Sequence, residues 1–454
     1  MGSRVRLRTL TLAAVFSLAF AACGGSSASK SPSTAPSAGP SSAASAASSV
    51  SAAPNVGFTL KYGVLMSSTG DLAATGATWN HTIDLAMLTI NNALKAQGLD
   101  GKIKLEKSAA DDGGTAATGV EGANKLVKSD GVSVILGPCC SGVTVAVAQG
   151  VTIAANVPMF TIGSSPTISA LDSKGTVFRT TPADNLQGGA LAQFVSAQLG
   201  AGKMVNIGAR NDAYGQGLAT EFSKAYTALG GKVGLTVQWD PKQATFDTEA
   251  QKLVSNSPDG WVFFDYEQSF INVGAALART GKFDGSKTFG ADSLACNAGT
   301  VAVNKSCGAP VGMRGTQASV VGGSGYPFFQ QVWQANLDPK VAYQGTFEPE
   351  GWDGAMISFL AALQGNSAAP ADIVKNIHAV TDTGGTEYTA EHIGDAIKDI
   401  LAGKKVKYIG ATGPCVFNEH GDVSTSTFTI WWQQAANAAA AYGKIPDIQY
   451  SPPK

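Results

Sequence analysis

The chain has 454 residues, of which 44% are hydrophobic, with 54 glycines and 19 prolines. Its 32 lysines and arginines are balanced by 33 acidic residues, so the net charge of −1 gives no basic excess for binding nucleic acid or an anionic membrane surface. Beyond residue 55 the chain is long enough for two domains and contains no apolar stretch long enough to span a membrane.

Residues 1–22 have the organisation of a secretory signal peptide. Three arginines in residues 4–8 precede an apolar run at 10–20, which is too short to cross a bilayer. Cys23 stands directly after the expected cleavage site. Residues 24–55 are almost entirely Gly, Ser, Ala, Pro and Thr, a composition that predicts a disordered, flexible linker.

The position of Cys23 resembles the lipobox of bacterial lipoproteins, in which this thiol is acylated and becomes the new N-terminus. Phe20 departs from the aliphatic residue that is usual three positions earlier. The resemblance implies an exported protein that is anchored in the cell envelope by a lipid on Cys23. The alternative is an ordinary signal peptide with an unmodified cysteine.

Five further cysteines follow in the body of the chain. Cys296 and Cys307 are separated by a short Gly/Asn/Ser-containing loop, which favours a local disulfide in an oxidising compartment. The pairing of the other three, Cys139, Cys140 and Cys415, stays open. No Cys-x-x-Cys pair is present and the four histidines are scattered, so we expect neither a metal site nor a cofactor.

From residue 58, apolar runs alternate with amphipathic segments, which predicts strands and helices in turn. The predicted strands of the first half are residues 58–66, 102–108, 132–136 and 158–162. The predicted helices between them are residues 78–97, 119–129 and 143–155, after a loop at 67–76. This alternation is typical of a parallel sheet covered on both faces by helices.

The same alternation restarts after residue 182, so we expect two similar α/β lobes, each with a doubly wound sheet. The predicted helices of the second lobe are residues 185–199, 214–229, 246–255 and 270–279. Its predicted strands are residues 203–208, 232–239, 260–264 and 288–290. Later predicted elements are helices at 327–334, 352–363 and 391–401 and a strand at 426–432.

Five segments in this order and spacing resemble the type I periplasmic solute-binding proteins of ABC importers, in particular the branched-chain amino-acid-binding group. They are residues 62–71, 134–144, 157–165, 211–217 and 413–422. The resemblance implies two Rossmann-like lobes joined by three crossover hinges, with a ligand in the cleft between them. The implied boundaries are 56–181 with 318–417 for the N-terminal lobe and 182–317 with 418–454 for the C-terminal lobe.

Two loops that follow predicted strands have the groups that bind an anion. In doubly wound sheets, ligands lie beyond the carboxyl ends of the strands. Ser141 follows one such strand, and the loop of Gly163, Ser164 and Ser165 follows the next. By resemblance, these residues hold the α-carboxylate of an amino acid; the alternative is that the serines only cap helices.

The resemblance also implies residues that approach the ligand from the second lobe. Asp292 occupies the place of an acid that would pair with the ligand's ammonium group, a favourable pairing in a desolvated cleft. Tyr214 and Tyr266 would contact the ligand beside it. Trp352 would form an apolar wall or, equally, belong to the core. Lesser candidates are Thr75 and Trp79.

Some members of this family bridge the cysteine that corresponds to Cys140 to a partner near the Asp111-Asp112 segment, where this chain has Gly113 and Gly114. Cys140 therefore stays free, bridges to Cys139 or reaches Cys415. Neighbouring carboxylates on a strand end point apart, so Asp111 and Asp112 do not form an acid/base pair. Motifs of hydrolases, phosphate-binding loops and zinc proteases are absent from the sequence, so we do not expect an enzyme.

The sequence thus predicts a monomeric, lipid-anchored protein of the cell envelope that captures a small solute and delivers it to ABC permease and ATPase subunits on other chains. The expected ligand is a branched-chain or other neutral amino acid. Amides, urea and aromatic acids are alternative ligands. A ligand-sensing lipoprotein that partners a membrane receptor is the alternative function.

Overall fold

The computed structural model describes residues 56–295, 309–319, 323–341, 343, 347–382, 384–423, 426–433 and 448–450. All of them belong to one compact unit, Pro54–Lys454. The predicted signal peptide, Cys23, the linker, Cys296 and Cys307 lie outside the described residues.

The first sheet has five parallel strands in the order β2-β1-β3-β4-β5. The long central strand is buried from Tyr62 to Met66, since helices cover both faces of a parallel sheet. The strands are β1 (Phe58–Met66), β2 (Ile103–Asp111), β3 (Val134–Leu136), β4 (Met159–Thr161) and β5 (Val177–Arg179).

The second sheet has the order β15-β14-β10-β9-β8-β6-β7, and its strands β6 to β10 are parallel. Strands β14 and β15 add to it antiparallel. Its strands are β6 (Met204–Arg210), β7 (Lys232–Trp239), β8 (Gly260–Phe264), β9 (Thr288–Gly290), β10 (Arg314–Ala318), β14 (Ser426–Trp432) and β15 (Ile448–Tyr450). A small third sheet contains β11 (Thr386–Tyr388), β12 (Val406–Gly410) and β13 (Gly413–Pro414).

The parallel parts of the two large sheets have the same topology. In each, the first strand in sequence lies between the second and the third, and the fourth and fifth follow on the same side. The second strand therefore lies on one side of the first, and all later parallel strands lie on its other side. This reversal of direction creates a topological switch point at β1 and at β6. The predicted α/β fold with parallel sheets is confirmed.

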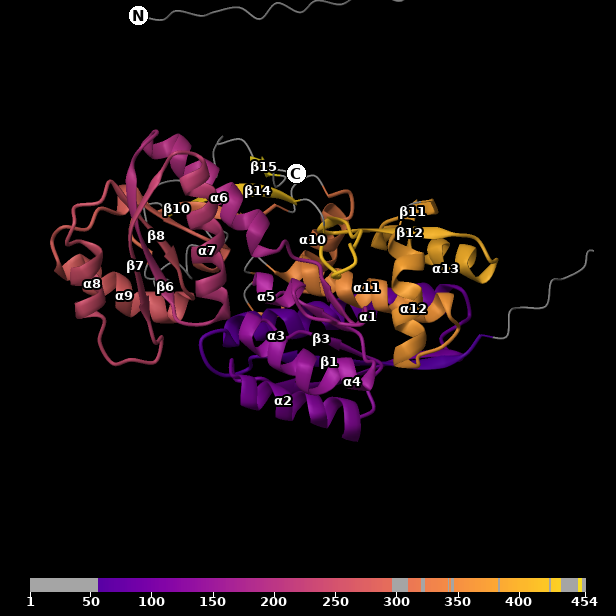
Figure 1. Ribbon diagram of the computed structural model, residues 1–454. Helices are drawn as coiled ribbons and strands as arrows, with labels where there is room; N and C mark the ends of the chain where they lie inside the picture. Colours follow the sequence, from indigo (N-terminus) through magenta and orange to yellow (C-terminus); the bar gives the residue numbers. More distant parts are fainter. Residues whose placement is uncertain are drawn as a thin grey trace, which may run out of the picture. The chain divides into compact units, whose positions relative to one another are not determined.

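Helices cover these sheets (Figure 1). Helix α11 packs against α1, α12 and the first sheet, whereas α6 and α7 pack against each other and the second sheet. The helices are α1 (Ala73–Ala96), α2 (Ala116–Asn124), α3 (Ser141–Val147), α4 (Ile153–Ala155), α5 (Pro166–Ser169), α6 (Asp184–Leu199), α7 (Ala213–Ala228), α8 (Asp247–Leu253), α9 (Glu267–Arg279), α10 (Tyr326–Ala335), α11 (Glu348–Gln364), α12 (Pro370–Thr381) and α13 (Ile393–Leu401).

Helix α1 begins at Ala73, earlier than predicted, because its first turn packs closely on the end of β1. A Cβ atom at Gly76 would lie 1.8 Å from the carbonyl oxygen of Ser67, so only glycine allows this approach. The corresponding position in the second sheet is Gly215 in α7, where a Cβ would lie 2.2 Å from the carbonyl oxygen of Arg210. Both glycines bring a helix start close to a strand end.

Other regions also differ from the predicted elements. The predicted helix at 143–155 is α3 and α4 joined by a π-helical turn, Ala148–Thr152. Helix α12 was not predicted, although Ile373, Ile377 and Val380 form a buried stripe at helical spacing.

Three segments of the chain connect the part with the first sheet to the part with the second. They follow β5, follow β10 and precede β14. The lobe boundaries at residues 181/182, 317/318 and 417/418 remain a prediction.

Candidate functional site

A cavity of about 270 Å³ lies where the carboxyl ends of strands from both large sheets converge. From the first sheet, Asp71 and Thr75 follow β1, and Ser141 and Ser164 follow β3 and β4. From the second sheet, the cavity receives residues that follow β6, β8 and β9, namely Tyr214, Tyr266 and Asp292. The two switch points therefore face a common site, as expected for doubly wound sheets.

On the first-sheet side, the Ser141 hydroxyl organises the loop after β4. Its Oγ accepts hydrogen bonds from the backbone N–H groups of Ser164 and Ser165, each at 3.2 Å. No side chain caps helix α3, so Ser141 does not act as a helix cap. Since Oγ accepts both bonds, the hydroxyl hydrogen of Ser141 can be donated to a molecule in the cavity.

Two residues of the predicted anion loop lie behind the cavity wall. Ser165 is buried and caps α5 by accepting a hydrogen bond from the N–H of Thr167. Gly163 packs so tightly that a Cβ would lie 2.7 Å from Oγ1 of Thr144. The structure thus brings Ser141 and Ser164 to the cavity and leaves Gly163 and Ser165 in supporting positions.

Arg179, which we did not predict, fixes the other side of this loop. Its fully buried guanidinium donates to the carbonyl oxygens of Ser164 at 2.8 Å and Ser165 at 3.0 Å, and to Oδ1 of Asp422 at 2.6 Å. A buried arginine requires such a partner, and the charge within the Val177–Arg179 strand was the signal available in the sequence.

On the second-sheet side, Asp292 supplies a buried carboxylate. Its Oδ1 accepts hydrogen bonds from the Tyr214 hydroxyl at 3.1 Å and from the N–H of Ser293 at 2.7 Å. Burial raises the pKa of Asp292 to about 6, so the group is largely ionised at neutral pH. A cation in the cavity would find its partner here.

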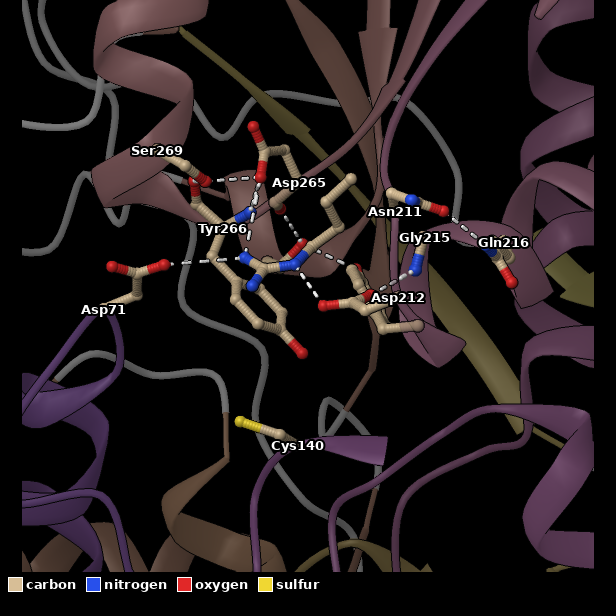
Figure 2. Close-up of polar contacts among 12 residues, drawn as sticks. Asp71, Cys140, Asn211, Asp212, Gly215, Gln216, Asp265, Tyr266 and Ser269 are labelled. Carbon is tan, nitrogen blue, oxygen red and sulfur yellow. Dashed lines mark hydrogen bonds and ion pairs between the residues drawn. The ribbon is translucent and has the colours of Figure 1, made fainter. Parts of the chain in front are cut away.

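The rings of Tyr214 and Tyr266 stack on each other with their centroids 5.1 Å apart. The Arg210 guanidinium lies 3.7 Å from the centroid of Tyr266, a cation–π contact that holds the ring. Figure 2 shows Tyr266 with the acids Asp71, Asp212 and Asp265 around it. Arg210 pairs with Asp265 at 3.6 Å and also with Asp71, at 3.7 Å, from the first-sheet side. This arrangement joins the two walls of the cavity.

Of the two alternatives for Trp352, the structure has the core position and not the cavity wall. Its side chain is fully buried in α11 and packs against Phe329, with ring centroids 5.4 Å apart, because α11 is buried on all sides. Tyr343 and Phe347, just before this helix, line the cavity in its place. Of the two lesser candidates, Thr75 lines the cavity, whereas Trp79, one turn further along α1, is buried in the core.

Two acids near the site were not predicted. Glu267, at the start of α9, lines the cavity, and burial raises its pKa to about 7. Asp184, at the start of α6, is fully buried, and its burial, together with the charge of Asp292, raises its pKa to about 8. Lys340 is the one cation among the described residues that line the cavity, so the site is suited to a ligand that carries a positive group.

Cys139, Cys140 and Cys415 are buried free thiols. Of the three alternatives for Cys140, the structure therefore has the unbridged one. In the part of the chain that the structure describes, no group of three or more His, Cys, Asp or Glu side chains is placed to bind a metal ion. No helix of this part combines the length and apolarity that crossing a membrane requires.

The fold, with two doubly wound sheets around a shared cavity, is that of type I periplasmic binding proteins. Residues 59–383 match the family model described as "Periplasmic binding protein", and the chain belongs to this family. It is 26% identical over 395 residues to the Leu/Ile/Val-binding protein BraC3 of Rhizobium johnstonii, covering 86% of this chain and 95% of the relative.

Two solved structures show the same fold. The branched-chain amino acid transporter substrate-binding protein LivJ of Streptococcus pneumoniae, in complex with isoleucine, superposes with a TM-score of 0.66 at 19% identity, over 87% of this chain and 100% of that one. A solute-binding protein of an ABC transporter from R. palustris, in complex with 4-hydroxybenzoate, has a TM-score of 0.66 at 17% identity, over 87% and 98% of the two chains.

Proposed function

We propose that this protein is the lipid-anchored, extracytoplasmic solute-binding component of an ABC importer, and that it captures a branched-chain or other neutral amino acid in the cavity between its two large sheets. The family and the Rhizobium relative support a solute-binding role. The observation that carries the amino-acid assignment is that a buried carboxylate, Asp292, and the hydroxyl group of Ser141 face the same cavity from different sheets.

These two groups suit the two charged ends of an α-amino acid. The ammonium group pairs with Asp292, whose carboxylate is already oriented by Tyr214. The carboxylate receives the hydroxyl hydrogen of Ser141, whose oxygen is held in place by the N–H groups of Ser164 and Ser165. A ligand that contacts both walls of the cavity binds better when the walls are close together. Binding therefore shifts the protein toward a closed state, which the permease recognises.

The remaining wall suits an uncharged ligand side chain. Tyr266, Tyr343 and Phe347 contribute aromatic surface, and Val341 lies beside them. Apolar surface of this kind favours burial of an aliphatic or aromatic group. This wall supports a neutral amino acid over a strongly charged one.

An aromatic acid is the second candidate ligand. The R. palustris neighbour with 4-hydroxybenzoate and the aromatic wall favour it. A benzoate, however, has no ammonium group for Asp292, and its carboxylate adds a negative charge to a cavity that already contains Asp292 and Glu267. The cavity's acidic residues therefore favour the amino acid.

A thermal-shift screen tests this assignment with L-leucine, L-isoleucine, L-valine, L-glutamine, urea, acetamide and 4-hydroxybenzoate. We expect at least one neutral amino acid to raise the unfolding temperature, since a ligand at 100 times its Kd stabilises the folded state by about 2.7 kcal/mol. A rise with 4-hydroxybenzoate alone would select the second candidate. No rise with any amino acid would contradict the assignment.

The anchor and the loop disulfide are separate parts of the proposal. A lipid on Cys23, with residues 24–55 as tether, would keep the protein near its permease. Labelling of cells with radioactive palmitate should mark the wild type but not Cys23→Ser. Peptide mass mapping without reductant should find Cys296 bridged to Cys307; two unmodified thiols there would contradict the disulfide.

A further inference from the structure

Two adjacent thiols lie at the cavity, and binding of an amino acid does not explain them. Cys139 lines the cavity and is 7% exposed, and Cys140, next to it, is 8% exposed. Their Sγ atoms are 3.7 Å apart. They connect β3 to Ser141, the residue that organises the loop after β4, so a change at these thiols reaches the proposed ligand site directly.

Cys139 is connected to a buried acid through a hydroxyl group. Its Sγ lies 3.6 Å from Oγ of Ser67, which donates its hydrogen to Oδ1 of Asp112 at 2.5 Å. Because the hydroxyl hydrogen of Ser67 points to Asp112, its oxygen is the acceptor for the thiol hydrogen of Cys139. The three side chains form a route for a proton from the thiol to the carboxyl group.

Asp112 is suited to receive this proton. The residue is fully buried, and its Oδ2 has no hydrogen-bond partner among the described residues. Burial raises the pKa of Asp112 above its ordinary value, so its ionised carboxylate is a stronger base than that of an exposed aspartate. Its neighbour Asp111 instead accepts hydrogen bonds from Ser68 and Thr69, so only one of the two acids serves the thiol.

Cys140 lies near two residues of the second-sheet side. It lies close enough to Tyr266 and Arg210 to interact electrostatically with both. Cys140 directly precedes α3, and Figure 2 shows it on the side to which the Tyr266 ring extends. Cys139 therefore lines the cavity, and Cys140 lies near Tyr266.

We propose that Cys139 and Cys140 form a reversible thiol–disulfide exchange site in the cavity wall, and that its substrates are small-molecule disulfides that enter the cavity. Such compounds belong to the oxidising environment outside the cytoplasm. The exchange chemistry stands on the thiols alone, whereas its effect on amino-acid binding rests on the proposed function.

The exchange has two steps. Cys139 transfers its proton through Ser67 to Asp112, and its thiolate attacks one sulfur of the disulfide R–S–S–R. This forms Cys139–S–S–R and releases RS⁻, which takes the proton back from Asp112. The Cys140 sulfur then attacks the Cys139 sulfur and forms the Cys139–Cys140 bond, while the proton of Cys140 passes to the departing RS⁻, which leaves as a second RSH. Two protein thiols are oxidised, and one small disulfide is reduced to two thiols.

The product should be easily reduced. Adjacent Cα atoms are about 3.8 Å apart, closer than the roughly 4.4–6.8 Å that disulfides usually span. Strained disulfides are the labile ones, so a thiol reagent should reopen this bond. The site is therefore reversible.

The first test treats the reduced full chain with 2-hydroxyethyl disulfide and maps the peptides by mass. We expect the peptide with Cys139 and Cys140 to lose two hydrogen atoms and to keep no adduct, with dithiothreitol restoring it. Cys140→Ser should retain one mercaptoethanol adduct on Cys139. Cys415 is the control thiol: it is fully buried beside Asp353 and should stay unmodified. An unreactive Cys139, or an adduct that persists in the wild type, overturns the proposal.

A matched pair of variants tests the proton route. Asp112→Asn should slow modification of Cys139 by about 100-fold, as expected for loss of a proton acceptor, with little change in the unfolding temperature. Asp112→Glu should restore part of the rate, and Asp111→Asn should keep the wild-type rate. Equal rates for Asp112→Asn and Asp111→Asn would remove Asp112 from the mechanism.

L-leucine tests the coupling to binding. Oxidation should weaken its binding about tenfold in the wild type and leave Cys139→Ser, which has no thiol lining the cavity, unaffected. Equal affinity of the reduced and oxidised forms would overturn the coupling. If L-leucine binds neither form, the amino-acid assignment is in question, while peptide mapping still decides the exchange site.

Discussion

Ser141 and Asp292 face one cavity from different sheets, and each is prepared by its neighbours. The hydroxyl oxygen of Ser141 already accepts hydrogen bonds from two backbone N–H groups of the loop after β4. These bonds orient the hydroxyl group and leave its hydrogen for the ligand. Asp292 is oriented by Tyr214 and the N–H of Ser293. Preorganised groups of this kind bind a ligand with little further loss of entropy.

Replacing Ser141 with alanine should weaken L-leucine binding about tenfold, because the ligand carboxylate loses a donor and the loop loses an acceptor. Titration calorimetry measures the change. Ser165→Ala is the matched control: it removes the cap of α5, at a cost of about 1 kcal/mol in stability, but should leave affinity unchanged. Equal affinity of Ser141→Ala and wild type would leave Ser141 a purely structural role.

Binding of an ammonium group should depend on pH through Asp292. Its pKa of about 6 means that acidification below this value protonates the carboxylate and removes the partner of the cation. We expect the Kd for L-leucine to rise about tenfold for each pH unit below 6 and to level off above 7. Calorimetry between pH 5 and 8 tests this, and a Kd independent of pH would contradict it.

At the scale of single residues, the sequence was informative for several side chains that follow a strand. Ser141 and Ser164 were predicted this way and Asp292 from the family resemblance, and the structure places all three at the cavity. The sequence did not decide between wall and core for Trp352, since its position on a fully buried helix depends on packing with α1 and α12. Arg179 was missed because its partner, Asp422, is 243 positions away.

At the scale of elements, two of the connecting segments are joined by a buried ion pair. Arg179 ends β5, and Asp422 lies in the segment that precedes β14. Asp422 also accepts a hydrogen bond from Ser169 at 2.7 Å. The pair therefore links the loop after β4 to two of the segments that run between the sheets.

Asp422→Ala should destabilise the protein by about 3–5 kcal/mol, because it leaves the fully buried charge of Arg179 without its partner. Denaturant unfolding measures this cost. Asp172→Ala removes an exposed pair with Lys174 and should cost only about 0–1 kcal/mol. Similar small losses in both variants would show that the Arg179 pair does not hold the connecting segments.

Elements with strong local patterns were predictable, and those that depend on distant contacts were not. Lys232–Trp239, Gly260–Phe264 and Ser426–Trp432 were predicted with their observed bounds. The first turn of α1 lacks an apolar period and is helical because Gly76 packs on Ser67. The three-stranded sheet of β11 to β13 was missed, since its strands are short and pair only after the chain folds.

At the scale of the molecule, the repeated strand order explains why the cavity lies where it does. Each sheet has its switch point at its first strand, β1 or β6, and the residues after the strand ends line one shared site. Arg210, paired with Asp265 and with Asp71, joins the walls beside that site. A ligand with two opposite charges would strengthen this junction from inside.

The most direct test of the account is a calorimetric titration of L-leucine into the wild type and Asp292→Asn at pH 7.5. We predict saturable binding to the wild type and an affinity about 100-fold lower in the variant, which keeps the shape of the side chain but loses its charge. Equal affinity in the two proteins would contradict an ammonium site at Asp292, and with it the assignment of an amino acid to this cavity.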